Sequence, residues 1–215
     1  MAYTLLDLQT AVQDDLKDSS FSATRITRYL NAGQLAIFNT YTFRFCEKAY
    51  SGTATISAVT QAQQSDHQST IGGILIDPSD TNRRFIMDKK SYMPHRDFFD
   101  QYPAPDLNTA GMPGAWTEYG NDIYFSCPLD VAYTFKQRYF RVPTALANST
   151  DVPDVPEAFR ELLELYADYR SEKYRGNHDV AATYLQQFED GLEAMALRFG
   201  PATQMAPITA GTAKS

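Results

Sequence analysis

The sequence lacks the residue patterns by which most enzymes are recognised. It contains no GxxxxGK[ST] phosphate loop, no GxGxxG turn after a strand, no HExxH helix and no GxSxG elbow. Its three histidines, His67, His95 and His178, are far apart and stand in polar surroundings, so we expect all three at the surface rather than on a metal. These absences predict a protein that is not an enzyme and binds no cofactor or metal.

Cysteines and long hydrophobic runs are also scarce. The two cysteines, Cys46 and Cys127, have no CxxC partner and no nearby histidine. Their apolar neighbours favour buried thiols, and the sequence leaves open whether they pair in a disulfide. No apolar run approaches the roughly 20 residues of a membrane helix. Because the N-terminus also lacks the basic and apolar regions of a signal peptide, we expect a product of the cytoplasm without a membrane partner.

Basic charge is in short supply. The 215 residues include 19 Lys and Arg against 26 Asp and Glu, which gives a net charge of −7. The basic residues are scattered, whereas nonspecific DNA binding requires clustered cations that release counterions. We therefore expect no attraction to DNA. The hydrophobic content of 43% and the aromatic content of 13% are nevertheless those of a folded chain.

Amphipathic helices are predicted at the beginning of the chain, over about residues 4–41. One apolar stripe spaced by three and four residues ends at Asp18-Ser19-Ser20, and a second follows Ser22, which we expect to cap its helix. Gly33 lies in the second stripe, where it costs roughly 1 kcal/mol relative to Ala, so we expect a close approach of two helices there. The two stripes comprise Leu5, Leu8, Val12 and Leu16, then Ile26, Tyr29, Leu30, Gly33 and Ile37.

A second helical pair is predicted over about residues 156–199. Pro156 suits a first helical turn, and Gly176-Asn177 separates the two helices, with Asn177 as the expected cap of the last one. Gly200-Pro201 provides the stop. Because the connection at Gly176-Asn177 is short, the two helices are expected to pack antiparallel.

The middle of the chain changes from helical to alternating periodicity. Residues 53–57 and 73–76 are predicted as strands separated by a polar loop, and residues 97–102 as a short helical turn. Residues 116–119 and 123–126 form a predicted hairpin around Gly120-Asn121, and residues 132–140 are expected to complete a three-stranded meander. In that last strand Tyr133, Phe135, Gln137 and Tyr139 share one face.

Together these elements predict an α+β fold. The N- and C-terminal helix pairs, residues 1–47 and 151–200, are expected to form an antiparallel helical bundle. Residues 48–150 form an inserted β-rich domain, either a small antiparallel sheet or a barrel. Residues 201–215 are rich in Ala, Thr, Gly and Pro and predict a flexible C-terminal arm, which is either a frayed end or a segment that orders on a partner.

Two functional alternatives rest on residues of the predicted hairpin. A cell-wall hydrolase would need a converging carboxylate pair, for which Glu118 and Asp122 are the candidates, although such pairs arise by chance among 26 carboxylates. A carbohydrate- or protein-binding module would use the meander as its binding face. It would expose Trp116 and Tyr133 and remain a stable monomer.

Short degenerate motifs recur in a fixed order along most of residues 4–200. They are residues 22–34 (SATRITRYLNAGQ), 41–45 (YTFRF), 97–100 (DFFD), 111–113 (GMP), 120–125 (GNDIYF), 128–130 (PLD), 155–159 (VPEAF) and 176–179 (GNHD). In these motifs and in the layout of its parts the chain resembles tailed-bacteriophage head-to-tail adaptor (connector, head-completion) proteins and, more distantly, the tail tubular protein A group.

The resemblance implies a structural virion protein rather than an enzyme. Because some short-tailed-phage adaptors resemble carriers of hydrolase activity, the hydrolase alternative becomes a virion-associated one. Such adaptors form a multi-copy ring, usually twelvefold, docked beneath the portal protein at the head–tail junction. The ring extends the channel through which DNA passes and presents a platform to a tail, nozzle or stopper protein. The C-terminal arm is then the expected contact with the portal, through Phe199, Pro201, Met205, Pro207 and Ile208. Such a particle is assembled in the host cytoplasm.

Overall fold

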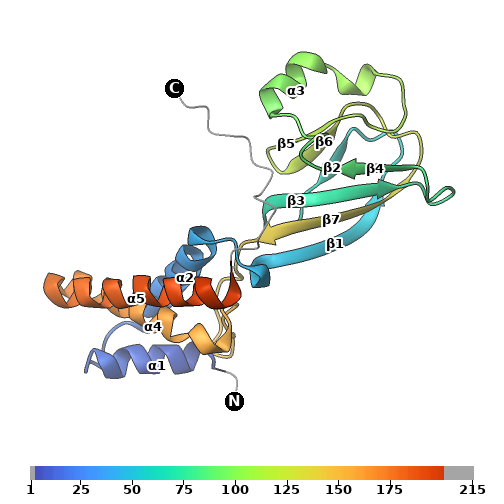
Figure 1. The fold of residues 1–215 in the computed structure, drawn as a ribbon. Helices are drawn as coiled ribbons and strands as arrows, with labels where there is room; N and C mark the ends of the chain where they lie inside the picture. Colours follow the sequence, from blue (N-terminus) through green and yellow to red (C-terminus); the bar gives the residue numbers. More distant parts are fainter. Residues whose placement is uncertain (1–2, 201–215) are drawn as a thin grey trace. The chain divides into compact units, whose positions relative to one another are not determined.

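The computed structural model describes residues 3–200, which form two compact units (Figure 1). The helical unit contains residues 3–46 and 142–200, and the β unit contains residues 47–141. Five α-helices and two antiparallel sheets lie in residues 3–200, so the predicted mixture of α and β structure is confirmed. The predicted domain limits, after residues 47 and 150, remain a prediction, because compactness alone does not show that either unit folds independently.

Helix α4 is the centre of the helical unit. It spans Glu161–Arg175 and contacts α1 (Leu5–Asp15), α2 (Ala23–Thr40) and α5 (His178–Phe199). The predicted apolar stripes of α1 and α2 are buried, including Leu8, Ile26 and Ile37 at 0% exposure. Helices from both ends of the chain therefore share one core, whereas the antiparallel bundle remains a prediction.

The ends of these helices largely follow the expected capping chemistry. Thr4 and Asp7 form a reciprocal capping box at the start of α1, and Ser22 accepts a hydrogen bond from the Arg25 amide at the start of α2. Gly176 ends α4 in the left-handed region at φ 85°. Asn177 stands at the expected N-cap position of α5, but its side chain makes no capping hydrogen bond, because its amide donates to the Glu172 carboxylate instead.

Two short features modify the helical unit. Pro156 precedes a single 3-10 turn, η3 (Glu157–Phe159), and α4 begins only at Glu161, after this turn. A second 3-10 turn, η1 (Arg44–Cys46), ends the N-terminal segment. The expected close approach at Gly33 is confirmed, since a Cβ atom there would lie 3.2 Å from the ring of Tyr166 on α4.

The β unit contains two antiparallel sheets (Figure 1). The larger sheet has the order β1 (Glu47–Ala54), β7 (Tyr133–Arg141), β3 (His67–Ile76) and β4 (Arg84–Met87). The smaller sheet has the order β2 (Thr60–Ala62), β6 (Asp122–Phe125) and β5 (Trp116–Tyr119). The predicted hairpin of β5 and β6 is confirmed, with Gly120 at φ 63° in its two-residue loop.

Three expectations for this region are wrong. Strand β7 does not extend the hairpin into a meander, because it pairs with β1 and β3 in the other sheet. The barrel is also excluded within residues 3–200: the order of the larger sheet ends at β1 and β4, and closure would require these edges to pair. Finally, β2 and the start of β3 occupy much of the predicted polar loop, and β4 was not expected.

Residues from both sheets form the core of the β unit. Trp116, Phe125 and Phe135 are each 0% exposed within one hydrophobic cluster. Helix α3 (His95–Gln101), close to the predicted helical turn, covers the other side of the small sheet, where the Phe99 ring lies 5.3 Å from the ring of Tyr124. A last 3-10 turn, η2 (Pro105–Leu107), follows α3.

Candidate interaction surfaces

The candidate carboxylate pair does not converge. In the β5–β6 ladder Glu118 is paired with Ile123, whereas Asp122 is paired with Tyr119. Paired residues point to the same face of a sheet and successive residues to opposite faces, so Glu118 and Asp122 lie on opposite faces of the hairpin. The geometry that the hydrolase alternative required of these two residues is therefore absent.

Glu118 instead belongs to a buried polar network between the two sheets. Its Oε1 accepts hydrogen bonds from the Thr70 hydroxyl and, at 3.1 Å, from the Gln63 amide. Thr70 Oγ1 in turn accepts from Gln137 Nε2 at 2.7 Å. His67 Nε2 lies 3.0 Å from Thr70 Oγ1 and 3.5 Å from Glu118 Oε1. The network thus joins strands β3 and β7 of the larger sheet to β5 of the smaller one.

The protonation of this network follows from its burial. Burial lowers the pKa of His67 to about 4, and it raises the pKa of Glu118 against the opposing hydrogen bonds from Thr70 and Gln63. Because the Thr70 hydroxyl donates its single hydrogen to Glu118, it must accept from both Gln137 and His67, so neutral His67 carries its hydrogen on Nε2. The expectation that His67 lies at the surface is wrong, since its side chain is only 5% exposed.

The two aromatic residues proposed for a binding module are not at the surface. Trp116 and Tyr133 are both 0% exposed. The Trp116 indole donates to Ser91 Oγ at 3.2 Å and to the Asp88 carbonyl at 3.3 Å, and the Tyr133 hydroxyl donates to Asp130 at 2.7 Å. Both rings therefore belong to the core of the β unit. The prediction that a binding module would expose them is wrong.

Phe199, the one predicted partner-binding residue among the described residues, belongs to an aromatic cluster. Its ring lies 5.8 Å from that of Phe45 and 5.7 Å from that of Phe159, each nearly perpendicular to it. The other members of this predicted site, Pro201, Met205, Pro207 and Ile208, lie outside the described residues. The end of α5 is thus fixed in the helical unit immediately before that segment.

A group of acidic side chains on α4 was not expected from the sequence. Asp168 is only 1% exposed, and its Oδ1 has no hydrogen-bond partner among the described residues. Burial, together with the nearby Asp15 and Glu164 carboxylates, raises the pKa of Asp168 to about 8. Burial also raises the pKa of Glu164, which accepts a hydrogen bond from the Tyr3 hydroxyl. The helical unit therefore holds an acid that is protonated at neutral pH.

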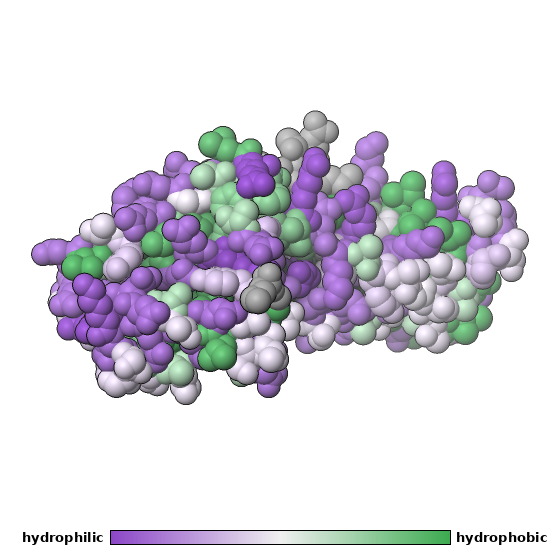
Figure 2. Space-filling view, turned by 90° about the horizontal axis from the view of Figure 1, so that it is seen from below, coloured by the Kyte–Doolittle hydropathy of each residue, from purple (hydrophilic) through white to green (hydrophobic). Residues whose placement is uncertain are grey.

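Acidic charge is concentrated in the helical unit. Its sequence segments contain 15 Asp and Glu against 9 Lys and Arg, whereas the β unit contains 11 against 9. The net charges are thus −6 and −2, and Lys214 accounts for the remaining charge of the chain. Figure 2 shows that one face of the molecule is mostly hydrophilic, with exposed hydrophobic side chains in separate small patches.

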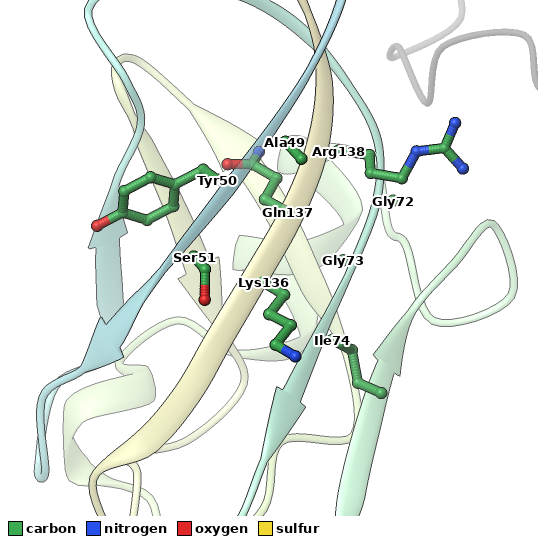
Figure 3. Close-up of a pocket in the computed structure, with 9 residues that line it drawn as sticks. All are labelled: Ala49, Tyr50, Ser51, Gly72, Gly73, Ile74, Lys136, Gln137 and Arg138. Carbon is green, nitrogen blue, oxygen red and sulfur yellow. The ribbon is translucent and has the colours of Figure 1, made fainter.

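The outward face of the larger sheet is lined by small and basic residues. Tyr133, Phe135, Gln137 and Tyr139 share one face of β7 as predicted, and this inward face is buried. On the outward face Lys136 is in register with Ser51 and Ile74, and Arg138 with Ala49 and Gly72. A shallow groove of about 600 Å³ follows these strands, and Figure 3 shows Arg138 extending from β7 across β3 beside Gly72.

A second groove lies in the helical unit, between η3, α4 and α5. It measures about 450 Å³ and has Phe159, Leu162 and Leu165 on one side and Asp190 and Gly191 on the other. Gly191 permits the close contact of α5 with α4, since a Cβ atom there would lie 2.2 Å from a methyl carbon of Leu162. Both grooves are open at the surface of their units.

Residues 3–200 hold neither a metal-binding cluster nor a helix that could span a membrane. Within this range no group of three or more His, Cys, Asp or Glu side chains is arranged to hold a metal ion. None of the helices there is both long enough and apolar enough to span a membrane. Both cysteines are thiols; Cys46 is buried and Cys127 is half-buried.

Comparison with known families first gives the class of protein, which is a structural adaptor of bacteriophages. The SU10 adaptor protein family matches residues 3–211, nearly the whole of this chain, and the chain therefore belongs to that family. The resemblance to phage head-to-tail adaptors seen in the sequence is confirmed. No curated protein matches the chain at a significant level.

Proposed function

We propose that this protein is the head-to-tail adaptor of a virion neck. In this role many copies form a ring, which we expect to be twelvefold. The ring docks beneath the portal, extends the DNA channel and provides the platform to which the tail attaches. The observation that carries the proposal is the match to the SU10 adaptor family over residues 3–211. The particle would be assembled in the host cytoplasm.

The presence of two compact units supports the proposal that the protein connects several partners. A chain with two separate cores presents more independent faces than a single core of the same length, and cyclic assemblies use different faces for neighbours and for partners. We propose that the units act as domains, with residues 1–47 and 151–200 forming the helical one and residues 48–150 the β-rich one.

The distribution of charge supports passage of DNA without binding. A helical unit with a net charge of −6 repels the phosphate backbone wherever its acidic surface faces a channel. Specific or nonspecific DNA binding would instead require several clustered cations. We therefore propose that DNA moves through the ring without sequence-specific contacts.

We propose that the segment after α5 contacts the portal. Phe199 holds the end of α5 through its contacts with Phe45 and Phe159, so the following residues leave from a fixed point. The apolar candidates beyond it are Pro201, Met205, Pro207 and Ile208, within the proposed arm of residues 201–215. Ordering such a segment on a partner exchanges chain entropy for buried contact area.

Native mass spectrometry of the full chain, with and without the portal protein of the same virus, tests the proposal. We expect a multi-copy ring bound to the portal, with a smaller species when the chain is alone. A chain that neither oligomerises nor binds the portal would contradict the proposed function.

Paired substitutions test the arm within that experiment. The Met205→Ala, Ile208→Ala double variant should weaken portal binding at least tenfold, because it removes two apolar side chains from the contact. The Thr203→Ala, Thr209→Ala variant of the same segment is the matched control and should bind like the unaltered chain. Equal binding by both variants would remove the arm from the proposal while leaving the ring intact.

A further inference from the structure

We propose that the outward face of the sheet β1-β7-β3-β4 receives the acidic, exposed face of helix α5 from a second copy of this chain. The inference rests on the proposed ring and specifies the surfaces by which neighbouring copies meet. The sheet face and the α5 face carry opposite charges on one acidic chain. Neither of them contributes to the core of its own unit.

The sheet face is shaped to accept a regular element. Gly72, Ala49 and Ser51 bring only small side chains to it, which leaves the groove of about 600 Å³ along the strands. Ile74 and Ile86 are in register on β3 and β4 beside this groove, and Ile86 is 51% exposed. The face therefore combines a shallow floor with apolar surface that another helix would bury.

The charge of this face is opposite to that of the chain. Lys136 and Arg138 of β7 and Arg84 of β4 all point outward and are exposed. Glu47 forms an ion pair with Arg138, whose side chain remains 63% exposed. With three cations and one carboxylate, this face carries a net positive charge, whereas the whole chain has a net charge of −7.

Helix α5 offers the complementary face. It packs on α4 through one side, where Ala181, Phe188, Leu192 and Met195 are buried. The opposite side of the helix is exposed and acidic, and the helix also carries Leu197 at 89% and Val180 at 48% exposure. The exposed acidic residues are Asp179, Glu189, Asp190 and Glu193.

The observations favour a protein helix over DNA as the occupant of the sheet face. Three cations, one already paired with Glu47, would neutralise too few phosphates for stable DNA binding. The half-buried Ile74 and the exposed Ile86 also match the apolar residues of α5 better than a phosphate backbone would. Because the two faces differ, their contact is heterologous, and repeated contacts of this kind close into a ring when the rotation between neighbours permits.

Charge reversal on each face tests the proposal in the full chain. The sheet variant is Lys136→Glu with Arg138→Glu, and the helix variant is Glu189→Lys with Glu193→Lys. Each variant alone should lose neighbour association by at least tenfold in sedimentation at low salt and in native mass spectrometry on the portal. An equimolar mixture of the two variants should restore assembly, because each altered face then meets a face of opposite charge.

Matched controls separate this contact from a general charge effect. Lys89→Glu with Lys90→Glu changes two exposed lysines elsewhere in the β unit, and Asp14→Lys with Glu157→Lys changes two exposed acids elsewhere in the helical unit. Both controls should assemble normally. Circular dichroism of every variant checks that it is folded, and rescue in the mixture excludes misfolding as the cause of lost assembly.

The outcomes distinguish this inference from the proposed function. Rings that form equally well from either reversed variant would overturn the sheet–helix contact and leave the adaptor function standing. Loss of DNA co-sedimentation by the sheet variant without loss of assembly would assign the face to DNA and also overturn the inference. A wild-type chain that remains a single copy both alone and with the portal would overturn both proposals.

Discussion

The two units of this adaptor bury polar side chains in opposite ways. In the β unit, Glu118, Thr70 and His67 satisfy one another between two sheets. In the helical unit, Asp168 is buried beside other carboxylates, with one oxygen that has no partner among the described residues. The comparison shows that a buried acid can either tie elements together or make their packing depend on protonation.

This difference predicts opposite responses of the two units to pH. Groups whose folded-state pKa is raised favour the folded state at lower pH, whereas a histidine with a lowered pKa favours it at higher pH. The single tryptophan, Trp116, lies in the β unit, so its fluorescence reports unfolding there. Far-UV circular dichroism reports mainly the helical unit, which holds four of the five described α-helices.

The largest expected effect is the loss of a core ring from the β unit. Phe135 is 0% exposed in the cluster around Trp116, so Phe135→Ala should lower the free energy of unfolding of this unit by about 3–5 kcal/mol. Denaturant titration followed by Trp116 fluorescence measures the change, with the exposed Lys136→Ala as a neighbouring control. An equal shift of the circular dichroism transition would show that the two units unfold as one.

A smaller effect is expected from removing the buried acid of the helical unit. The folded-state pKa of Asp168 is raised to about 8 from 3.8, so the unfolded chain releases this proton first and helical stability should fall between about pH 4 and pH 8. Asp168→Asn should flatten that dependence and stabilise the unit at pH 8 by about 1–3 kcal/mol. Thermal melts followed by circular dichroism at several pH values measure it.

The exposed Asp14→Asn is the control for that measurement, because it removes a carboxylate of the same unit without relieving burial. If wild type and Asp168→Asn show the same pH dependence from pH 5 to pH 8, ionisation of Asp168 does not destabilise the helical unit.

The smallest effect is expected from the histidine of the β unit. Burial lowers the pKa of His67 to about 4 from 6.5, so β-unit stability should be complete above pH 6.5 and decrease as the pH falls toward 4. His67→Gln should reduce this loss of stability at acid pH by about 1 kcal/mol. The effect is small because Glu118, whose pKa is raised, titrates in the opposite sense. Fluorescence-detected denaturation at pH 4.5 and 7 measures the change.

His178, exposed at the start of α5, provides a matched His178→Gln control for that titration. Stability of the β unit that rises on acidification from pH 6.5 to pH 4.5, in wild type but not in His67→Gln, would reverse the assigned role of His67.

Local patterns predicted the helices and the hairpin because their signals are local. The stripe at Leu5, Leu8 and Val12, the cap at Ser22 and the turn at Gly120 each specify structure within a few residues. The partners of β7 could not be obtained in this way, because β1 and β3 are far from it in sequence. Proximity in sequence wrongly favoured the hairpin as its neighbour.

The buried polar groups were missed for a related reason, although signals for both were present. Gln137 is the one polar member of the predicted apolar face of β7, and such a residue requires a buried partner, which is Thr70. Glu164, Asp168 and Glu172 recur every four residues along α4, which predicts acidic neighbours on one side of a helix. Only the packing of other elements shows that Gln137, Asp168 and Glu172 are buried and that Glu164 is half-buried.

The places where the chain passes between its units suggest how the fold can vary. It leaves the helical unit at Cys46 and returns at Val142, and Glu47 is in register with Phe140 on the adjacent strands β1 and β7. The two crossings are therefore separated by about one strand spacing, roughly 5 Å. Along the chain, the whole β unit is therefore an insertion in the helical unit, at a place where a short surface loop could equally connect Cys46 to Val142. Exchange of residues 47–141 for a segment of different size would change the β unit without disturbing the core of the helical unit.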